Sequence, residues 1–281
     1  MQNPTTYATL AAYGSATGTN ANSKAFDPLF INTAGPEISQ FQLNGTGLTI
    51  AGITTDINGA TRTSPPDIGA DEFTPPAFDV KMGRIAAPVE GCGLSDEEIV
   101  QVALVNMGST VASGFDVYFD FAGEVVAENI GSLQVPPGDT LFYTFTETID
   151  PSMFGTHLLS TWIDFPSDVN PSNDSASYTF TNYPPLNIPP GNLIPANGTT
   201  GLENQVSLSW SPVTNATSYK LFIWPSTGSK PVTPTYSGLT TINQLATGLS
   251  YGTTYLWQVH AVNICDEELA SDTSTFSVRF L

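Results

Sequence analysis

The sequence predicts an all-β protein that is built from several modules. Apolar and polar residues alternate in many short runs, and helical periodicity is nearly absent. Many of the 22 Pro and 24 Gly residues stand between these runs, where turns would join strands. A period of two that is broken by Gly, Pro and Asn turns implies stacked sheets and argues against a parallel α/β core.

Two proline-rich segments, Thr74–Phe78 and Asn182–Pro195, divide the chain. Proline cannot donate a hydrogen bond to a strand ladder and it holds the backbone extended, so both segments are predicted to be semi-rigid linkers. The expected modules are therefore residues 1–76, 77–183 and 184–281. A chain of 281 residues is long enough for two or three domains.

The last module, 184–281, carries Trp210 on its second predicted strand, Tyr219 at the start of the third, and the run "LSYGTTYLWQVHAVN". These residues resemble a fibronectin type III domain over the whole module. The resemblance implies that Leu249 and Tyr255 form a tyrosine corner, in which the phenol hydrogen-bonds the backbone. Alternation leaves His260 facing outward, with no assigned role, and places four residues inward: Tyr255, Trp257, Val259 and Ala261.

The middle module, 77–183, has strict alternation in "EEIVQVALVNMG" and "GFDVYFDF". One face of each run is apolar: Val100, Val102 and Leu104 in the first, and Phe115, Val117, Phe119 and Phe121 in the second. Together with the Asp/Asn-rich loop "DFPSDVNPSND", these runs resemble the CARDB-like, immunoglobulin-type sandwiches of bacterial surface proteins. The preceding "CGLS" resembles modules of secreted Bacteroidota proteins.

The first module, 1–76, contains "AFDPLFIN", "TTDINGATR" and "PDIGADEF". These phrases resemble the C-terminal coils of secreted right-handed parallel β-helix proteins, some of which are polysaccharide lyases. The expected fold class is thus all-β, with terminal coils of a β-helix followed by two Ig-like β-sandwiches in tandem. A coil cannot bury its apolar face alone, so we expect it to rest on upstream β-helix coils, on the middle module or on another copy of the chain.

The charge is strongly acidic, with 7 Lys and Arg against 26 Asp and Glu and a formal net charge of −19. Such a surface repels nucleic acid and anionic membranes, so neither is an expected partner. No Lys or Arg lies between Arg84 and Lys220, which is typical of secreted bacterial β-domains and favours an extracellular or cell-surface location. No apolar stretch is long enough for membrane insertion. The N-terminus lacks the basic and apolar regions of a signal peptide, so we expect either that an export signal lies upstream or that Met1 is not the true start.

The two cysteines, Cys92 and Cys265, form no Cys-x-x-Cys motif and have no neighbouring His. A zinc site is therefore not expected. Our expectation is that each thiol is buried or inert. The alternative is an intramolecular bridge, which would have to join two different modules.

No catalytic constellation emerges from the sequence, and the chain is predicted not to be an enzyme. The two histidines, His157 and His260, lie in different modules, and no Gly-x-Ser-x-Gly motif surrounds a serine. The carboxylates that are adjacent in sequence, such as Asp71 and Glu72, would face opposite ways in a strand. Spacing therefore gives no acid–base pair.

An oxygen-rich loop makes calcium the metal to consider, because this hard cation prefers oxygen ligands. The five candidate ligands are Asp164, Asp168, Asn170, Asn173 and Asp174. The alternative is an Asx-rich turn whose side chains bond only to their own backbone. Asp56 and Asn58 in "TDING" form a weaker fragment of a calcium-loop pattern. No other cofactor is expected.

Three aromatic residues are candidates for stacking on sugar rings: Trp162, Trp224 and Tyr236. If Leu159, Thr161 and Ile163 face inward, Trp162 faces outward, where it would bind polysaccharide or pack on a neighbouring module. Two short motifs, Asp-Ser-Ala at 174–176 and Asp-Thr-Leu at 139–141, resemble the O-glycosylation acceptor of Bacteroidota secreted proteins. They would place glycans on Ser175 and Thr140.

The function that these observations favour is a non-catalytic extracellular structural or adhesive module array of a bacterial surface or secreted protein. One alternative is the accessory C-terminal region of a β-helix polysaccharide lyase, which would help to bind carbohydrate. A second is a subunit of an extracellular polymer, assembled by strand pairing through the N-terminal region.

Overall fold

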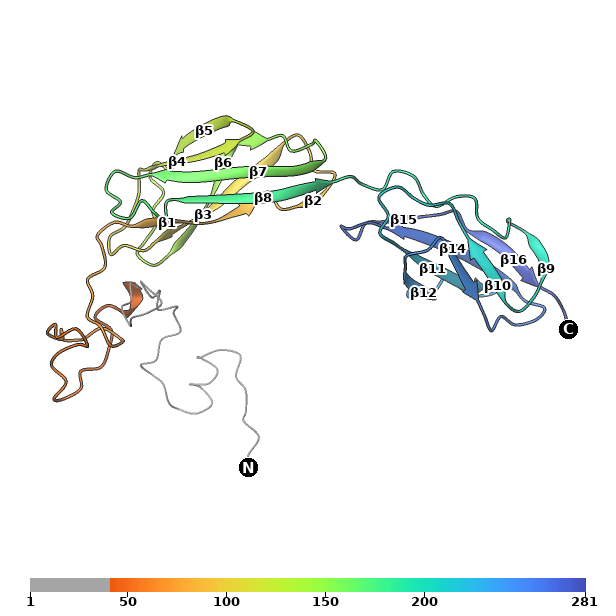
Figure 1. Cartoon of the computed structure of the whole chain (residues 1–281), viewed down its shortest axis with the longest axis horizontal. Coiled ribbons are helices and arrows are strands. Elements are labelled where there is room, and N and C mark those ends of the chain that lie inside the picture. The colour runs from red at the N-terminus through yellow and green to blue at the C-terminus, as the bar shows by residue number, and fades with distance from the viewer. Residues whose placement is uncertain (1–40) are drawn as a thin grey trace, which may run out of the picture. The chain divides into compact units, whose positions relative to one another are not determined.

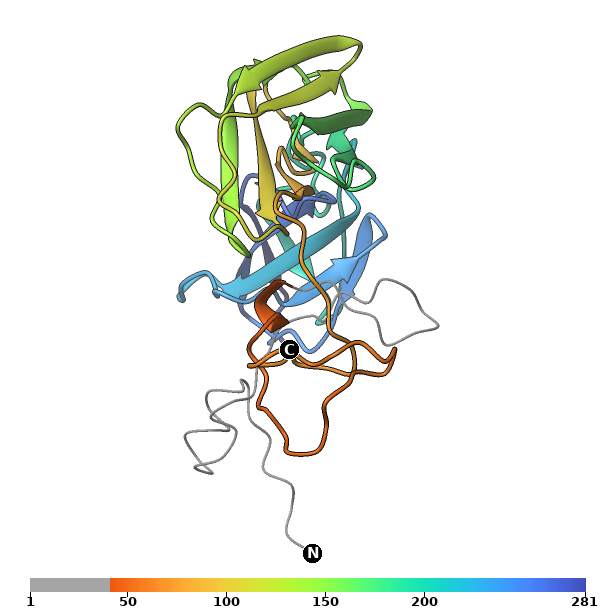
Figure 2. The ribbon, with the colours of Figure 1, turned by 90° about the vertical axis from the view of Figure 1, so that its left-hand side faces the viewer.

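The computed structural model describes residues 41–281, and the expectations on residues 1–40 lie outside the described part of the chain. The described part is all-β apart from one short 3-10 helix, η1 (Phe41–Leu43) (Figure 1). Figure 2 shows the same strands from a second direction, again with no long helix in the coloured part of the chain. Accordingly, no helix within residues 41–281 is long and apolar enough to cross a membrane.

The chain divides into two compact units. The first comprises Met1–Pro88, Ile99–Ile149 and Leu158–Thr179, and the second comprises Val89–Glu98, Asp150–His157 and Phe180–Leu281. The module boundaries near residues 76 and 184 stay a prediction.

Eight strands form the middle sandwich, in two sheets ordered β1-β3-β6 and β2-β8-β7-β4-β5. The strands are β1 (Val80–Ala87), β2 (Gly91–Cys92), β3 (Glu98–Asn106), β4 (Asp116–Phe121), β5 (Glu124–Asn129), β6 (Thr140–Ile149), β7 (Gly155–Asp164) and β8 (Ser175–Tyr183). β1 pairs with β3, and β4 with β5 and β7, in antiparallel register. β2 pairs with β8 in parallel. β7 and β8 each run from one compact unit into the other.

The predicted inward faces of this sandwich are confirmed. Phe119 on β4 meets Phe145 on β6 edge-on, with ring centroids 4.9 Å apart, so the two sheets pack face to face. The residues that alternation placed inward are all buried: Val100, Val102, Leu104, Phe115, Val117, Phe119, Phe121, Leu159, Thr161 and Ile163. Burying each large apolar side chain contributes about 1.5–3 kcal/mol. The period-two pattern is therefore what drives these strands into two layers.

Asn106 ends β3 and shows how a buried polar residue is accommodated in this core. Its Nδ2 donates to the carbonyl oxygens of Thr110 and Val135, each at 2.7 Å, and its Oδ1 accepts from the N–H of Gly108 at 2.8 Å. Asn106 has no exposed surface, so losing these bonds would leave uncompensated polar groups. The Asn-x-Gly pattern of the sequence thus fixes the turn after β3.

The second sandwich holds eight strands. They are β9 (Thr199–Leu202), β10 (Val206–Ser209), β11 (Ser218–Pro225), β12 (Tyr236–Leu239), β13 (Asn243–Ala246), β14 (Thr254–Val262), β15 (Glu268–Ala270) and β16 (Ser274–Val278). One sheet is ordered β12-β11-β14-β16-β9 with β15 paired to β14, and the other is β10-β13. β16 pairs with β9 in parallel, whereas β11 and β14 pair antiparallel. Trp257 and Leu208 lie fully buried in the core between these sheets.

The expected tyrosine corner is present in this second sandwich. The hydroxyl of Tyr255 accepts a hydrogen bond from the N–H of Ser250 at 2.9 Å. A second phenol, Tyr219, accepts from the N–H of Val213 at 2.9 Å. The four residues predicted to face inward from Tyr255 to Ala261 are buried. His260 faces outward as expected, and its ring contacts Glu268.

Residues 41–76 hold η1, one isolated bridge between Thr55 and Thr61, and turns. No strand and no β-helix coil is seen in these residues, although strands had been expected there. Carboxylates organise the segment instead. Asp56 accepts the N–H groups of Asn58, Ala60 and Glu72 at 2.9, 2.7 and 3.0 Å.

The phrase "PDIGADEF" continues this arrangement. Asp67 accepts the N–H groups of Gly45 and Phe73. Glu72 accepts the N–H groups of Thr63 and Asp67, at 3.0 and 2.9 Å. Burial raises the pKa of Glu72, but hydrogen bonds from Thr63, Asp67 and Arg62 outweigh that effect and leave the pKa lowered. The acidic residues therefore act as acceptors for loop amides that no ladder satisfies.

Candidate functional site

The Asp/Asn-rich loop folds over the start of β1. Asp168 Oδ1 accepts the N–H of Asn170 at 2.7 Å, and Asp168 Oδ2 accepts the N–H of Val80. Asn173 donates from Nδ2 to Asp79 Oδ1 at 2.9 Å. Part of the loop is thus held by backbone bonds, as the Asx-turn alternative predicts, and part meets a residue far away in the sequence.

Asp79 is a member of this cluster that sequence reasoning missed. It directly precedes β1, lies 94 residues before Asn173, and is only 8% exposed. The one available signal was a lone Asp after a proline-rich linker, which is common and uninformative. Conversely, Asp164 ends β7 as an exposed residue opposite Asp116 of β4. Its strand position puts it on the outward face with Trp162.

Two oxygens in the cluster have no hydrogen-bond donor. Asn173 Oδ1 and Asp174 Oδ1 are inaccessible to solvent and unpaired. Burial, then repulsion from Asp168 and Asp79, raises the pKa of Asp174 to about 6. Burial is also the main cause that raises the pKa of Asp79. Negative charge is therefore concentrated here, and Lys81 offsets it only in part by lowering the pKa of Asp79.

Chemically, this set of carboxylate and amide oxygens suits a hard cation such as Ca²⁺. Within residues 41–281, however, no group of three or more His, Cys, Asp and Glu residues is arranged so as to hold a metal ion. Amide and backbone oxygens would have to complete any coordination sphere. The other calcium fragment fits less well, because both oxygens of Asp56 already accept backbone N–H groups.

The three candidate aromatic residues occupy different environments. Trp162 faces outward, as predicted, and stacks on Tyr118, its register partner on β4, with centroids 5.2 Å apart and planes 4° apart. Trp224 on β11 is 8% exposed. Tyr236 begins β12 and packs against the buried core. Trp162 belongs to the first compact unit, where it lies on an outer sheet face, and the other two belong to the second unit.

The two candidate glycosylation positions are both exposed. Ser175 is the first residue of β8, and Thr140 is the first residue of β6. Each can therefore be reached from solvent at a strand end. Their use as acceptors stays a prediction.

The expectation that each cysteine is separately buried or inert is wrong. Cys92 and Cys265 form a disulfide across 173 residues of sequence, with a Cα–Cα distance of 6.1 Å. Cys92 lies on β2, opposite Tyr183, and Cys265 lies in the turn between β14 and β15. Asn263 supports this turn, since its Oδ1 accepts the N–H groups of Cys265 and Glu267 at 3.0 and 2.9 Å.

The two histidines make different contacts in the described residues, and His260 Nε2 lies 2.9 Å from Lys230 Nζ. The Nε2 of His157 lies 2.8 Å from the carbonyl oxygen of Met153, and His260 Nδ1 lies 2.8 Å from Glu268 Oε2. These contacts tie each ring to its own part of the fold. They give no arrangement for acyl transfer, which requires a base beside a hydroxyl or thiol.

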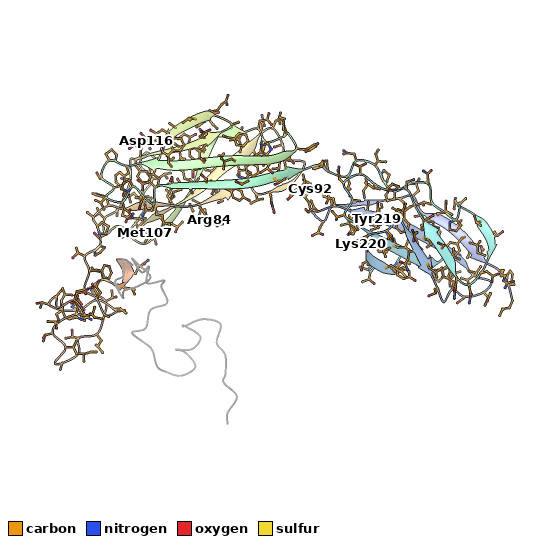
Figure 3. The ribbon with its side chains drawn as sticks, in the orientation of Figure 1. Arg84, Cys92, Met107, Asp116, Tyr219 and Lys220 are labelled. Atoms are coloured by element: carbon orange, nitrogen blue, oxygen red, sulfur yellow. A yellow bond between two sulfur atoms is a disulfide. The ribbon has the colours of Figure 1, made fainter. Side chains whose placement is uncertain are left out.

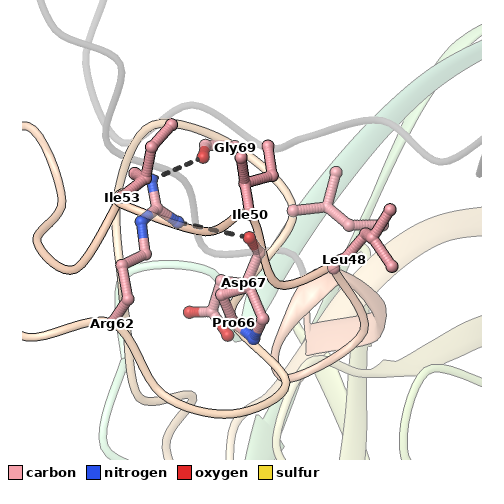
Figure 4. Close-up of a pocket in the computed structure, with 9 residues that line it drawn as sticks. Leu48, Ile50, Ile53, Arg62, Pro66, Asp67 and Gly69 are labelled. Atoms are coloured by element: carbon pink, nitrogen blue, oxygen red, sulfur yellow. Dashed lines mark hydrogen bonds between the residues drawn. The ribbon is translucent and has the colours of Figure 1, made fainter.

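A cavity of about 350 Å³ lies beside the loop of residues 47–69 (Figure 4). Leu48, Ile50 and Ile53 line it, and its charged residues are Arg62 and Asp67. The guanidinium donates to the carbonyl oxygens of Gly69 and Asp67 at 2.9 and 3.3 Å. It also pairs with Glu72 at 3.0 Å. The arginine therefore braces the loop, and its charge is already neutralised.

The strand orders and the two buried cores define a chain with Ig-like β-sandwich modules in tandem. No protein-family model matches the chain, and no curated protein matches it. Among solved structures, it is similar to an Fn3-like protein from Clostridium thermocellum, with 25% identity over 34% of this chain and 98% of that one and a TM-score of 0.28. It is also similar to the CARDB domain of a Pyrococcus furiosus protein. The identity is 16%, the match covers 40% of this chain and 98% of that one, and the TM-score is 0.30. A third similar structure is that of the fibronectin(III)-like modules of Clostridium thermocellum CbhA. The identity is 10%, the match covers 71% of this chain and 94% of that one, and the TM-score is 0.40.

Proposed function

We propose that this chain is a non-catalytic structural segment of a bacterial surface or secreted protein, in which it acts as a spacer or adhesive array. The observation that carries the proposal is the disulfide between Cys92 and Cys265. Disulfides persist in oxidising compartments and are rare in the cytosol. An extracellular array that bears tension gains from such a bond, because covalent linkage does not yield when strands separate.

Residues 41–76, which hold no strand, are proposed to be the loop-rich end of a module 1–76 that rests on upstream β-helix coils or on another copy of the chain. Four large apolar side chains in residues 41–76 support this proposal, because a partner surface would bury them. Leu48, Ile50, Ile53 and Ile57 are 53–70% exposed. Ten or more further coils upstream would favour the accessory region of a polysaccharide lyase. A signal peptide shortly before Met1 would favour an assembly unit of an extracellular polymer.

A structural calcium ion is proposed at the loop cluster, with Asp79, Asn173 and Asp174 as protein ligands; Asp164 lies on an outward strand face and is left out. Asp168 lies beside them, but both of its oxygens already accept backbone N–H groups. The unpaired, inaccessible oxygens of Asn173 and Asp174 support it. A bound cation would give both oxygens a partner and would offset the repulsion among the three carboxylates. Its role would be to fasten the loop to the start of β1.

Polymer cleavage assays test the absence of catalysis. The purified chain is incubated with pectin, alginate and chondroitin-type polymers, and both unsaturated products and reducing ends are followed. We expect no turnover above a heat-denatured control. Cleavage that co-purifies with the chain through successive columns would overturn the non-catalytic assignment.

A further inference from the structure

The outer face of the β1-β3-β6 sheet carries two cations side by side. Lys81 is the register partner of Val105, and Arg84 is the register partner of Ala103. Val105 and Ala103 are two apart on β3 and so point to the same face. A register shift between Met82 and Arg84 brings Arg84 onto that face together with Lys81. Figure 3 shows Arg84 and Met107 on this part of the sandwich.

These cations stand out against the rest of the middle module. Lys81 and Arg84 are its two basic residues, whereas residues 77–183 contain fifteen Asp and Glu. Among the described residues, neither cation forms a salt bridge; Arg84 instead lies over the ring of Phe142, with its Cζ 5.6 Å from the ring centroid. Neither charge is neutralised by an ion pair, although Lys81 also lowers the pKa of the nearby Asp79.

A groove of about 470 Å³ runs between the two cations and Phe142. No carboxylate lines it. Its other walls are small or apolar: Gly83, Ala103, Val105, Met107 and the methyl-bearing Thr140. Gly83 is needed for this shape, because a Cβ there would come within 2.9 Å of Val105 Cγ2 and 3.0 Å of the Ala103 carbonyl oxygen. Phe142 is half exposed at the rim.

We propose that this groove binds an acidic polysaccharide, a polymer of sugars that carry carboxylates. A uronate sugar has both an anionic group and an apolar ring face, which match the two kinds of surface in the groove. Its carboxylates complement Lys81 and Arg84, and the C–H face of its ring can pack on Phe142 and the apolar floor. This binding role goes beyond that of a spacer, and it uses none of the aromatic residues singled out from the sequence.

The chemistry of the groove disfavours other polyanions. The backbone groups of β3 are occupied by its neighbours on both sides, so a peptide in this groove could not add to the sheet as a strand and would rely on charge alone. Nucleic acid carries a much denser charge, and two cations in a chain of net charge −19 do not offset that repulsion. The same repulsion opposes an anionic membrane.

Calorimetry with the full chain tests the proposal. Polygalacturonate and alginate are titrated in EDTA, so that calcium cannot bridge polymer and protein. The matched comparison is polygalacturonate whose carboxylates are methyl-esterified, since its backbone is the same and its charge is absent. We expect the acidic form to bind about two- to thirtyfold more tightly, because two ion contacts contribute about 0.2–1 kcal/mol each.

Three variants locate the site. Lys81→Gln with Arg84→Gln together should weaken binding of the acidic polymer about tenfold, and Phe142→Ala should weaken it several-fold. Lys230→Gln, which removes an exposed cation of the second unit, should leave binding unchanged. Because Lys81, Arg84 and Phe142 are exposed, unchanged melting curves are expected for their variants and serve as the folding control. Lys230 contacts Gln258 and His260, so the melting curve of Lys230→Gln is compared with that of the wild type before its binding is interpreted.

Several outcomes would overturn the proposal. They are equal binding of the esterified and acidic polymers, no binding of either acidic polymer, and wild-type affinity in the Lys81→Gln/Arg84→Gln variant. Equally tight binding of polyglutamate or of phosphatidylserine vesicles, lost in the same variant, would show a general anion surface and would exclude sugar recognition.

Discussion

The side-chain Oδ1 of Asn263 accepts the backbone N–H of Cys265 at 3.0 Å, and so fixes the half of the disulfide that lies in a turn. The Nδ2 of the same side chain lies 3.3 Å from Sγ of Cys92. One amide therefore contacts both cysteines of the bond. Asn263 is 2% exposed, so water cannot replace these contacts.

Replacing this amide should loosen the turn. We expect Asn263→Ala to lower the free energy of unfolding by about 1–3 kcal/mol, because the N–H groups of Cys265 and Glu267 lose their acceptor. Urea denaturation of the oxidised protein measures the change. Asn187→Ala, at an exposed position without a hydrogen bond, is the matched control and should be neutral. Equal effects of the two substitutions would show that Asn263 does not support the turn.

The phenol of Tyr255 should stabilise the second sandwich through its bond to Ser250. We expect Tyr255→Phe to cost about 1–3 kcal/mol, since the Ser250 N–H is left without its acceptor. Tyr251→Phe removes a hydroxyl that makes no such bond and should be nearly silent. Thermal melts of both variants make the comparison, and a silent Tyr255→Phe would remove the tyrosine corner from the account.

Asp56 should organise residues 54–73 only while it is ionised. Its pKa is lowered chiefly by the hydrogen bond from the Glu72 N–H. A carboxyl whose folded pKa lies below its unfolded value stabilises the fold above the unfolded value, near pH 4, and loses that effect as the pH falls through the lowered folded pKa. Amide NMR signals of Ala60 and Glu72 should therefore shift together below about pH 4.

Two variants distinguish the roles of the two carboxylate oxygens of Asp56. Asp56→Asn keeps one acceptor oxygen, so the Ala60 amide should stay protected from exchange while the Glu72 amide loses protection. Asp56→Ala should expose both amides. Full protection of both amides in Asp56→Ala would mean that the backbone alone holds the loop.

A rise in pH should lower the stability of the loop cluster, and calcium should raise it. Without metal, the folded pKa of Asp174 is about 6 against 3.8 for the ordinary group, so the folded chain binds more protons and its stability falls as pH rises from about 4 to 6. Calcium at a hundredfold excess over its dissociation constant should add about 2.7 kcal/mol at pH 7, and less at pH 5. Urea unfolding in EDTA and in calcium measures both effects.

Asp174→Asn provides the control for this pH dependence. The substitution removes the titrating group, so the decline in stability between pH 4 and 6 should shrink. It also removes a charged ligand and should reduce the calcium effect. An identical unfolding midpoint in EDTA and in millimolar calcium would leave the loop as an Asx-rich turn.

The inward faces of both sandwiches could be predicted from the sequence. Burial of one side of a strand makes apolar residues recur at every second position, and this pattern is visible within a short segment. Val100 to Leu104 and Tyr255 to Ala261 follow that rule. A local pattern does not predict contacts between residues that are far apart in the sequence. The partner of Cys92 lies 173 residues away, and Asp79 joins its cluster only through the fold.

Two other features needed the register of the strands. The face that Lys81 and Arg84 share depends on the irregularity between Met82 and Arg84, which no alternation pattern reveals. In residues 41–76, the short acidic phrases were interpreted as β-helix coils by resemblance. In the described part, Asp56 and Asp67 instead accept loop amides, and a sequence pattern does not distinguish these two uses of Asp.

The central claim is that the chain is an extracellular spacer, and single-molecule extension from both termini tests it most directly. Tension enters the disulfide at Cys92 and leaves at Cys265, so the residues between them bear no load while the bond is intact. The oxidised chain should therefore release only its ends, including β1 and β16. Reduction, or Cys92→Ser with Cys265→Ser, should release the 173 residues of the bridged span as well. At about 3.3–3.6 Å per extended residue, the added contour length is about 600 Å. Equal extension of the oxidised and reduced chains would contradict the claim.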